Sequence, residues 1–341
     1  MIHIDGSQGE GGGQVLRTSL SLAILTGQDL LISGIRANRS NPGLAAQHLT
    51  AARAAAKICG GRLEGAARGS TELTFFPGEV RPGRYQFDIP TAGAATLVLQ
   101  TIFVPLSMAG GASSLTITGG THVPRSPCYH YLDLAWLPAM GEIGFDAGLA
   151  LEKAGFYPAG GGRISTRIRP PGGLRPLELT QRGELVRIRG ISAVANLDQS
   201  IAERQRRQAR LRIGTKIETE ISLTVMPSPG KGTMLFLLAE FDHTRACFFS
   251  LGERGKPAER VADDAVDALE AYLQTGGAVD PYLADQLLLP LCMAGGVSRL
   301  STSRITRHLL TNADVIRSYL PASIQIDGLE GEPGTVSIRP G

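Results

Sequence analysis

Residues 104–111 and 289–296 read VPLSMAGG and LPLCMAGG, and this near-identity decides the fold of the chain. A weaker copy, LAILTG, occupies residues 22–27. In each copy an apolar helix ends in glycine, and a β-branched strand, a second helix and two closing strands follow. Such self-similarity predicts a repeat architecture. We therefore expect an α+β protein whose large domain consists of three repeated β-α-β-α-β-β units.

The spacing of the three copies indicates an inserted domain. The glycines that end the first two helices are about 80 residues apart, and the next pair is about 185 apart. The excess of about 100 residues predicts a smaller α/β domain between units two and three. We place this domain at 180–277 and the large domain on both sides of it, at 1–179 and 278–341. Its predicted elements are strands at 185–191, 220–226, 233–241 and 246–251, and helices at 200–212 and 257–274.

The composition excludes several classes of protein. The chain has 341 residues, 43% of them hydrophobic and 19% charged, and no apolar run reaches the ~18 residues needed to span a membrane. No basic and apolar leader pattern begins the sequence, so we expect a cytoplasmic protein without a membrane partner. The net charge of +3 excludes a global polyanion-binding surface, so any nucleic-acid contact must be local. The scattered cysteines, expected to be buried reduced thiols, are Cys59, Cys128, Cys247 and Cys292.

A glycine-rich stretch, QGEGGGQVLR at residues 8–17, joins an alternating strand at 2–4 to an apolar helix. Free N–H groups and the positive end of the helix dipole favour an anion at such a turn. Glu10 is unusual there unless a cation also binds, so the stretch indicates a metal-bridged phosphate site. The alternative is an ordinary strand-to-helix turn with a solvated glutamate, since glycine patterns are common.

Five further segments are difficult to explain as scaffold. With residues 8–17 they resemble, in content and in order, the motifs of the RNA 3′-terminal phosphate cyclase family. The similarity covers essentially the whole chain, including GERG at 252–255 in the inserted domain. The five segments are GIRANRSNPGL at 34–44, TLVLQ at 96–100, GFYPAGGG at 155–162, YLADQ at 282–286 and RITRHLLTN at 304–312.

The resemblance implies an enzyme that converts an RNA 3′-terminal phosphate to a 2′,3′-cyclic phosphate with ATP and a divalent cation, Mg²⁺ or Mn²⁺. The neighbouring 2′-hydroxyl cannot cyclise a phosphate monoester directly, because the oxygens of that monoester are poor leaving groups. The resemblance therefore makes His308 a nucleophile that accepts AMP from ATP and passes it to the RNA phosphate. The flanking Arg304 and Arg307 would keep this histidine neutral and attract phosphate.

The resemblance and the residue chemistry together predict the rest of the site. Asp285 lies in an otherwise apolar helix, which is costly unless a metal or ATP is close. Tyr282 would stack on adenine opposite Pro127. For each of these residues, core packing or plain solvation is the alternative, and for His48 the alternative ligand is phosphate. The ATP contacts are Gln100, Pro127, Tyr282, Leu283, Ala284, Asp285 and Gln286; the RNA end contacts Arg17, Arg36, Arg39 and Gln47; and the metal ligands are Glu10 and His48.

The chain departs from the family pattern at HVPRSPCYH, residues 122–130. Only Pro127 remains of a pair of prolines, and His130 stands where the family carries an acid. The departure leaves the detail of the nucleotide pocket open. A basic run at 203–212 is more simply explained as a solvated helix face than as an RNA-binding surface.

Three other functions stay open at this point. The first is a non-catalytic family member that acts as a scaffold in ribosome assembly. The second is another enzyme built on the same repeated unit, since enolpyruvyl transferases resemble it in fold. The third is a plain RNA-binding module, which would bind RNA regardless of its 3′ end. The joint presence of Glu10, Asp285 and His308 argues against the scaffold. The sequence leaves open whether the protein is a monomer or a homodimer.

Overall fold

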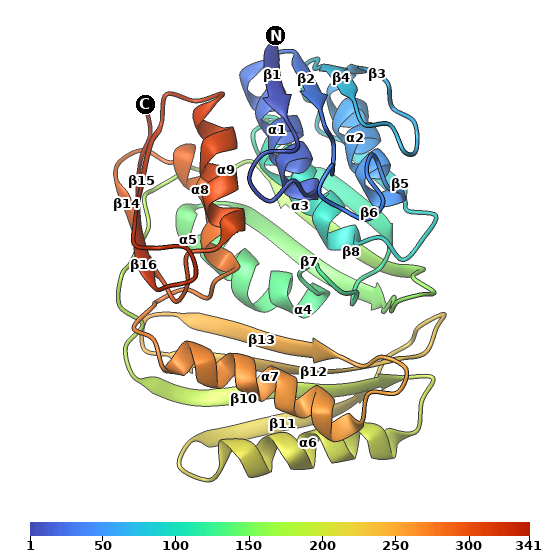
Figure 1. Ribbon diagram of the computed structural model, residues 1–341, viewed down its shortest axis with the longest axis vertical. Helices are drawn as coiled ribbons and strands as arrows, with labels where there is room; N and C mark the ends of the chain where they lie inside the picture. The colour runs from blue at the N-terminus through green and yellow to red at the C-terminus, as the bar shows by residue number, and fades with distance from the viewer.

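The computed structural model describes all 341 residues and contains four four-stranded sheets with helices packed against them (Figure 1). This mixed content confirms the α+β class. The first sheet has the order β1-β2-β4-β3, in which β1 and β2 are parallel and the other neighbours are antiparallel. Its elements are β1 (Ile2–Asp5), α1 (Gly13–Thr26), β2 (Leu30–Ser33), α2 (Ala46–Cys59), β3 (Arg62–Glu64) and β4 (Leu73–Phe76).

The second sheet has the order β5-β6-β8-β7 with the same pattern of one parallel and two antiparallel pairs. Its second helical segment is continuous but contains a π-helical turn, η1, between two α-helical parts. The elements are β5 (Arg84–Asp88), α3 (Ala95–Ser107), β6 (Ser113–Gly119), α4 (Tyr129–Tyr131), η1 (Leu132–Trp136), α5 (Leu137–Ile143), β7 (Asp146–Lys153) and β8 (Gly162–Arg169).

The third sheet has the order β9-β14-β16-β15, again with one parallel pair followed by two antiparallel pairs. Its first strand, β9 (Glu178–Leu179), lies more than 100 residues before its neighbour β14 (Ser298–Thr302). The chain therefore starts the third sheet, passes through the fourth sheet, and returns. The other elements are α8 (Leu283–Cys292), α9 (Arg307–Arg317), β15 (Ser323–Asp327) and β16 (Gly334–Arg339).

The fourth sheet has the order β11-β10-β12-β13, and α6 and α7 cover one of its faces (Figure 1). The alternation along β12 explains the packing, because Leu235 and Leu237 join the cluster under these helices, whereas Met234 and Phe236 join the main core. Every element predicted for residues 180–277 is present, with ends shifted by a few residues. They are β10 (Leu185–Ala195), α6 (Gln199–Ile213), β11 (Glu218–Val225), β12 (Gly232–Phe241), β13 (Arg245–Leu251) and α7 (Ala258–Leu273).

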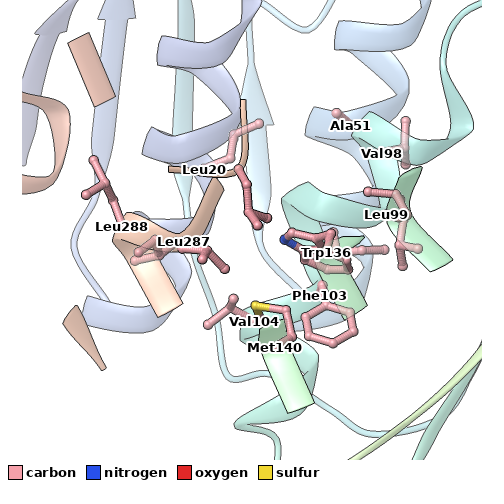
Figure 2. Close-up of a cluster of buried hydrophobic side chains, with 14 of the residues drawn as sticks. Leu20, Ala51, Val98, Leu99, Phe103, Val104, Trp136, Met140, Leu287 and Leu288 are labelled. Carbon is pink, nitrogen blue, oxygen red and sulfur yellow. The ribbon is translucent and has the colours of Figure 1, made fainter. Parts of the chain in front are cut away.

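The main core lies where helices of the first three sheets meet. Figure 2 shows Leu20 of α1, Phe103 of α3, Trp136 of η1 and Leu287 of α8 directed toward one another. The rings of Phe103 and Trp136 meet edge to face with centroids 4.8 Å apart, a favoured aromatic geometry. The apolar helices quoted at the outset therefore form one shared core.

This packing brings helix ends from distant parts of the chain together. Helix α1 contacts α9, and α9 contacts α8, so the three lie side by side (Figure 1). The glycine-rich stretch precedes α1, and His308 lies in the first turn of α9. No helix is both long enough and apolar enough to cross a membrane.

Candidate active site

The glycine-rich stretch is closely packed and needs its glycines. Gly9 and Gly11 have φ of 60° and 58°, in the left-handed region that favours glycine. A Cβ on Gly9 would lie 2.2 Å from Thr311 Oγ1, and one on Gly13 would lie 2.1 Å from His48 Nε2. Helix α1 starts after Gly12 without a side-chain cap, so its first N–H groups are available to an anion.

His308 lies at the centre of the predicted site. Thr306 caps α9 by accepting a hydrogen bond from Leu309 N at 3.1 Å, and this cap fixes the turn that carries the histidine. His308 Nδ1 is 2.5 Å from Gln14 Oε1. His308 Nε2 is 2.9 Å from Glu10 Oε2, and the imidazole is 41% exposed. One ring nitrogen is thus held by the protein, and the other faces a carboxylate at the protein surface.

Gln14 links His308 to Asp285 and determines the tautomer that we assign. Gln14 Nε2 donates a hydrogen bond to Asp285 Oδ2 at 2.8 Å, which orients the amide because an ionised carboxylate only accepts. Gln14 Oε1 therefore accepts from His308, so the proton of the neutral ring lies on Nδ1 and a lone pair lies on Nε2. A nucleophilic imidazole needs this arrangement. The sequence analysis assigned no role to Gln14.

Asp285 of α8 is held in turn by groups from two other helices, α1 and α9. It is only 6% exposed, and Asn312 Nδ2 donates to its backbone carbonyl at 2.7 Å. Thr18 Oγ1 donates to Asn312 Oδ1 at 2.7 Å. Burial raises the pKa of Asp285, while His308, Gln14 and Arg17 act in the opposite direction. Asn312 and Thr18 were not among the predicted site residues, although Asn312 ends the quoted motif at 304–312 and Thr18 directly follows the one at 8–17.

Glu10 forms an ion pair with Arg39 and lies next to His308. Burial works to raise the pKa of Glu10, but His308 and Arg39 outweigh it and hold the pKa below its usual value. Oε2 of Glu10 is buried and has no aligned hydrogen-bond donor, although His308 Nε2 is 2.9 Å away. Two lone pairs at that distance repel unless a cation or a proton lies between them. A cation at Glu10 therefore fits the residues that are present.

Three arginines and His48 line the other side of the glycine-rich stretch. Arg17 forms no hydrogen bond or ion pair within the protein, and burial lowers its pKa to about 10. Arg36 donates from Nη1 to Gly43 O at 2.8 Å. Burial, and then repulsion from these arginines, lowers the pKa of His48 to about 3, so His48 is neutral at physiological pH. The excess of unneutralised positive charge suits a phosphate.

Three of the residues predicted to contact ATP are joined by hydrogen bonds, and two others are buried. Gln100 Nε2 of α3 donates to Gln286 Oε1 at 2.6 Å, and Gln286 Nε2 donates to Tyr282 O at 2.7 Å. Tyr282 is 56% exposed, as a stacking surface must be. Leu283 and Ala284 are buried in the core, so only their backbone could reach a nucleotide.

Two more predicted residues have contacts within the protein. Pro127 O accepts from Thr96 Oγ1 at 2.8 Å, so its loop is tied to α3. Gln47 Oε1 accepts from Ala94 N at 2.8 Å at the start of α3, which leaves its amide N–H₂ for other partners. The structure thus brings His308, Glu10, Asp285, Arg17 and Arg39 together directly, and it connects Gln100, Gln286 and Tyr282 to them through α8.

A histidine, a carboxylate beside it and neighbouring arginines are groups that suit the chemistry of phosphates. The sequence profile of the family described as "RTC: RNA 3′-terminal phosphate cyclase" matches residues 8–326. The chain therefore belongs to the RNA 3′-terminal phosphate cyclase family, and it is an enzyme of the ligase class.

Curated relatives agree with this assignment over nearly their full length. The RNA 3′-terminal phosphate cyclase of Methylococcus capsulatus is 44% identical over 99% of this chain and 96% of its own. The protein of that name from Nostoc punctiforme is 44% identical over 96% of each chain, and the one from Methanopyrus kandleri is 42% identical over 100% of this chain and 99% of its own. The enolpyruvyl transferase NikO from Streptomyces tendae aligns with a TM-score of 0.41 at 10% identity over 99% of this chain and 48% of its own, which is too low to relate the two folds.

Proposed function

We propose that this enzyme uses ATP to convert an RNA 3′-terminal phosphate to a 2′,3′-cyclic phosphate through a covalent histidine–AMP intermediate. The family membership supports the cyclase activity and the use of ATP. The observation that carries the covalent step is the chain of hydrogen bonds from Asp285 through Gln14 to His308. It leaves Nε2 as an oriented nucleophile.

The reaction consists of three displacements at phosphorus. His308 Nε2 attacks the α-phosphorus of ATP, a P–N bond forms, and pyrophosphate leaves with the electrons of the broken P–O bond. An oxygen of the RNA 3′-phosphate then attacks the same phosphorus, and the histidine leaves, which gives an RNA–AMP anhydride. Finally the 2′-hydroxyl attacks the RNA phosphorus, loses its proton, and displaces AMP. Positioning and charge neutralisation are the main contributions that the protein makes to such steps.

A divalent cation, Mg²⁺ or Mn²⁺, would be held by Glu10, whose buried Oε2 lacks a hydrogen-bond donor. When bound, the cation supplies neutralisation of the phosphate charges. His48 is the second candidate ligand, because its lowered pKa keeps it in the neutral form that metal binding needs and its Nδ1 is buried without a partner. Its arginine neighbours suit a phosphate equally well, so phosphate is the alternative ligand of His48.

The RNA end would bind on the arginine side of the glycine-rich stretch. Arg17, Arg36 and Arg39 offer forked donors for the terminal phosphate, and Gln47 offers its amide N–H₂. Arg17 is the strongest candidate because no group of the protein neutralises it.

The ATP would lie along the start of α8. Tyr282 offers an exposed ring for the adenine, with Pro127 as the opposite wall, and stacking of this kind contributes roughly 1–3 kcal/mol per base. Gln100 and Gln286 are hydrogen-bonded to each other and offer amide groups to the edge of the base. Asp285, Leu283 and Ala284 complete the set, the last two through their backbone.

We also propose that the first three sheets derive from one repeated unit, which their common strand order supports. Residues 1–179 and 278–341 would form the large domain and 180–277 the inserted one. Since β9 precedes the insertion, the insertion interrupts the third unit after its first strand. The proposed location is the cytoplasm.

Covalent labelling tests the proposal. The purified protein is incubated with ATP labelled at the α-phosphate and a divalent cation, without RNA, and then denatured. We expect a labelled band that is labile in acid and stable in base, and that is lost in His308→Ala. His243→Ala, which removes an exposed histidine of the inserted domain, is the matched control and should keep the label.

The same preparations are then given an RNA oligonucleotide with a 3′-phosphate. Formation of a cyclic end by wild type and by the control, but not by His308→Ala, completes the assignment. Absence of the label in a folded protein, with several cations tried, would remove the nucleophile claim and favour the scaffold function.

A further inference from the structure

The segment that departs from the family pattern forms a buried cluster of three potential metal ligands. Ligand atoms of His122, Cys128 and His130 all lie within 4.8 Å of one another. His122 and Cys128 are 0% exposed, and His130 is 9% exposed. The cluster lies at the end of β6 and the start of α4, and it has no role in the phosphate chemistry described above. Buried polar groups with no catalytic task need a structural explanation.

The ligand nitrogens of the two histidines are already close together. His122 Nε2 and His130 Nδ1 are 3.0 Å apart. Two nitrogens bound to one tetrahedral Zn²⁺ at about 2.0–2.1 Å would be separated by about 3.3 Å, so their distance changes little on binding, and each ring turns so that its lone pair points to the ion instead of to the other nitrogen. A thiolate at about 2.3 Å would lie about 3.6 Å from each nitrogen, so Cys128 Sγ moves by on the order of 1 Å at most.

The surroundings of the cluster are those of a buried metal site. The remaining nitrogen of His122, Nδ1, is 2.8 Å from Thr121 Oγ1, and such outer contacts orient metal-bound histidines. Thr121 is itself held, because Gly155 N donates to Oγ1 at 2.9 Å. Phe156 stacks on His122 and Phe236 packs near His130, so the ligands lie in an apolar shell.

We propose that His122, Cys128 and His130 bind one transition-metal ion of the zinc class. The combination of two imidazoles and one thiolate favours Zn²⁺ over the hard cations Mg²⁺ and Ca²⁺. On binding, the Cys128 thiol loses its proton to solvent, and a Zn–S bond replaces the S–H bond. The cluster contains no fourth protein ligand, so water takes the remaining position.

The proposed metal ion would fix the loop between β6 and α4. This loop carries Pro127, whose carbonyl is bound to Thr96 of α3, and Phe236 beside His130 comes from β12. A metal there ties the end of the second sheet to the face on which the fourth sheet packs.

Metal analysis and cobalt substitution test the proposal. Protein expressed without a metal-binding tag in zinc-supplemented medium is dialysed, and its zinc is measured by mass spectrometry; we expect about one ion per chain. The metal-free protein is then titrated with Co²⁺, and a thiolate-to-cobalt charge-transfer band in the near ultraviolet should saturate at one equivalent. That band requires a cysteine ligand, so a cation at Glu10 cannot produce it.

Four variants make the test specific. Cys128→Ser and His130→Gln should lose the zinc and the cobalt band, whereas Cys292→Ser, which changes a buried thiol elsewhere, and Glu10→Gln should keep both. Circular dichroism checks that each variant is folded. Folded wild-type protein that contains no zinc and gives no thiolate band would overturn the proposal, whatever the variants do, and leave a plain hydrogen-bonded histidine pair.

Discussion

The imidazole of His308 is held at Nδ1 by an amide that is itself oriented by a carboxylate. Two residues therefore share the work of orienting the ring: one supplies the negative charge, and the other makes the hydrogen bond to Nδ1. Asp285 lies in the core and supplies the charge, while Gln14 transmits its orientation to a ring that stays partly exposed. The proposed nucleophile would therefore be preorganised without a negative charge touching the ring through Nδ1.

Gln14→Met tests this role at the scale of one residue. The variant keeps the length of the side chain but cannot accept from His308, so the ring loses its fixed tautomer and orientation. We expect the rate of AMP transfer to His308 to fall about 10–100-fold, the range for outer-shell partners of reactive histidines. Single-turnover labelling with α-labelled ATP measures it. Gln325→Met, at an exposed position of β15, should react at the wild-type rate; equal rates for both variants would contradict the role.

Arg17→Met tests whether Arg17 binds the RNA substrate while destabilising the folded protein. Burial lowers the pKa of Arg17 to about 10 despite nearby Asp285 and Glu10, so its charge is disfavoured in the folded state. We expect the melting temperature to stay the same or rise by about 1–3 °C, while kcat/KM for RNA 3′-phosphate falls by at least about 100-fold. Calorimetry and a cyclisation assay measure the two effects. A melting temperature that drops by several degrees would show that Arg17 is structural.

The start of α8 is controlled by a buried carboxylate outside the predicted site. Asp280 Oδ1 accepts from Tyr282 N at 2.9 Å and from Leu283 N at 3.1 Å, so it caps the helix that carries the ATP residues. Tyr131 OH donates to the same carboxylate at 2.8 Å. Burial raises the pKa of Asp280 to about 6, although these donors act in the opposite direction. The start of the helix that carries residues proposed to bind ATP thus rests on a group that titrates near neutral pH.

Asp280→Asn tests this cap by its pH dependence. Because the pKa is higher in the folded than in the unfolded chain, the native state binds more protons between about pH 4 and pH 6, and stability falls as pH rises through that window. Relative to Asp280→Asn, the free energy of unfolding of wild type should therefore decrease by on the order of 3 kcal/mol from pH 4 to pH 7. Urea unfolding across this range measures it, with the exposed Asp327→Asn as control. Parallel curves for wild type and Asp280→Asn would disprove the effect.

The charged side chains of α6 and of the candidate site differ in their partners. Two arginines of the basic run on α6 are neutralised by α7, since Arg204 pairs with Glu259 at 2.7 Å and Arg212 pairs with Asp263 at 3.1 Å. The interpretation of this run as an ordinary charged helix face agrees with these pairs. In contrast, Arg17 has no acidic partner within ion-pair distance.

RNA binding should accordingly depend only weakly on salt. If Arg17, Arg36 and Arg39 make the phosphate contacts, the logarithm of the affinity should fall with the logarithm of the salt concentration with a slope of about −2 for single-stranded RNA. Fluorescence anisotropy with a 3′-phosphate oligonucleotide measures the slope, and a 3′-hydroxyl oligonucleotide is the matched ligand. A slope steeper than about −5, or equal binding of the two ends, would indicate an extended basic surface instead.

The sequence by itself determined the features that lie within short stretches of chain. The helix end at Gly27, every element of residues 180–277 and the family membership followed from local patterns and their order, whereas α3 ends at Ser107, before Gly110. The resemblance to the family, together with residue chemistry, made His308, Glu10, Asp285 and the arginines a candidate set.

Only the tertiary structure decided how those residues meet. Gln14 is 271 residues from Asp285 and 294 from His308, so its part in orienting the nucleophile depends on how α1, α8 and α9 pack. The same holds for β9, whose two residues are too few to give a strand pattern and which is defined by its pairing with β14. Long-range contacts of this kind are set by burial of the shared helical core, and no local pattern encodes which polar groups that burial brings into hydrogen-bonding distance.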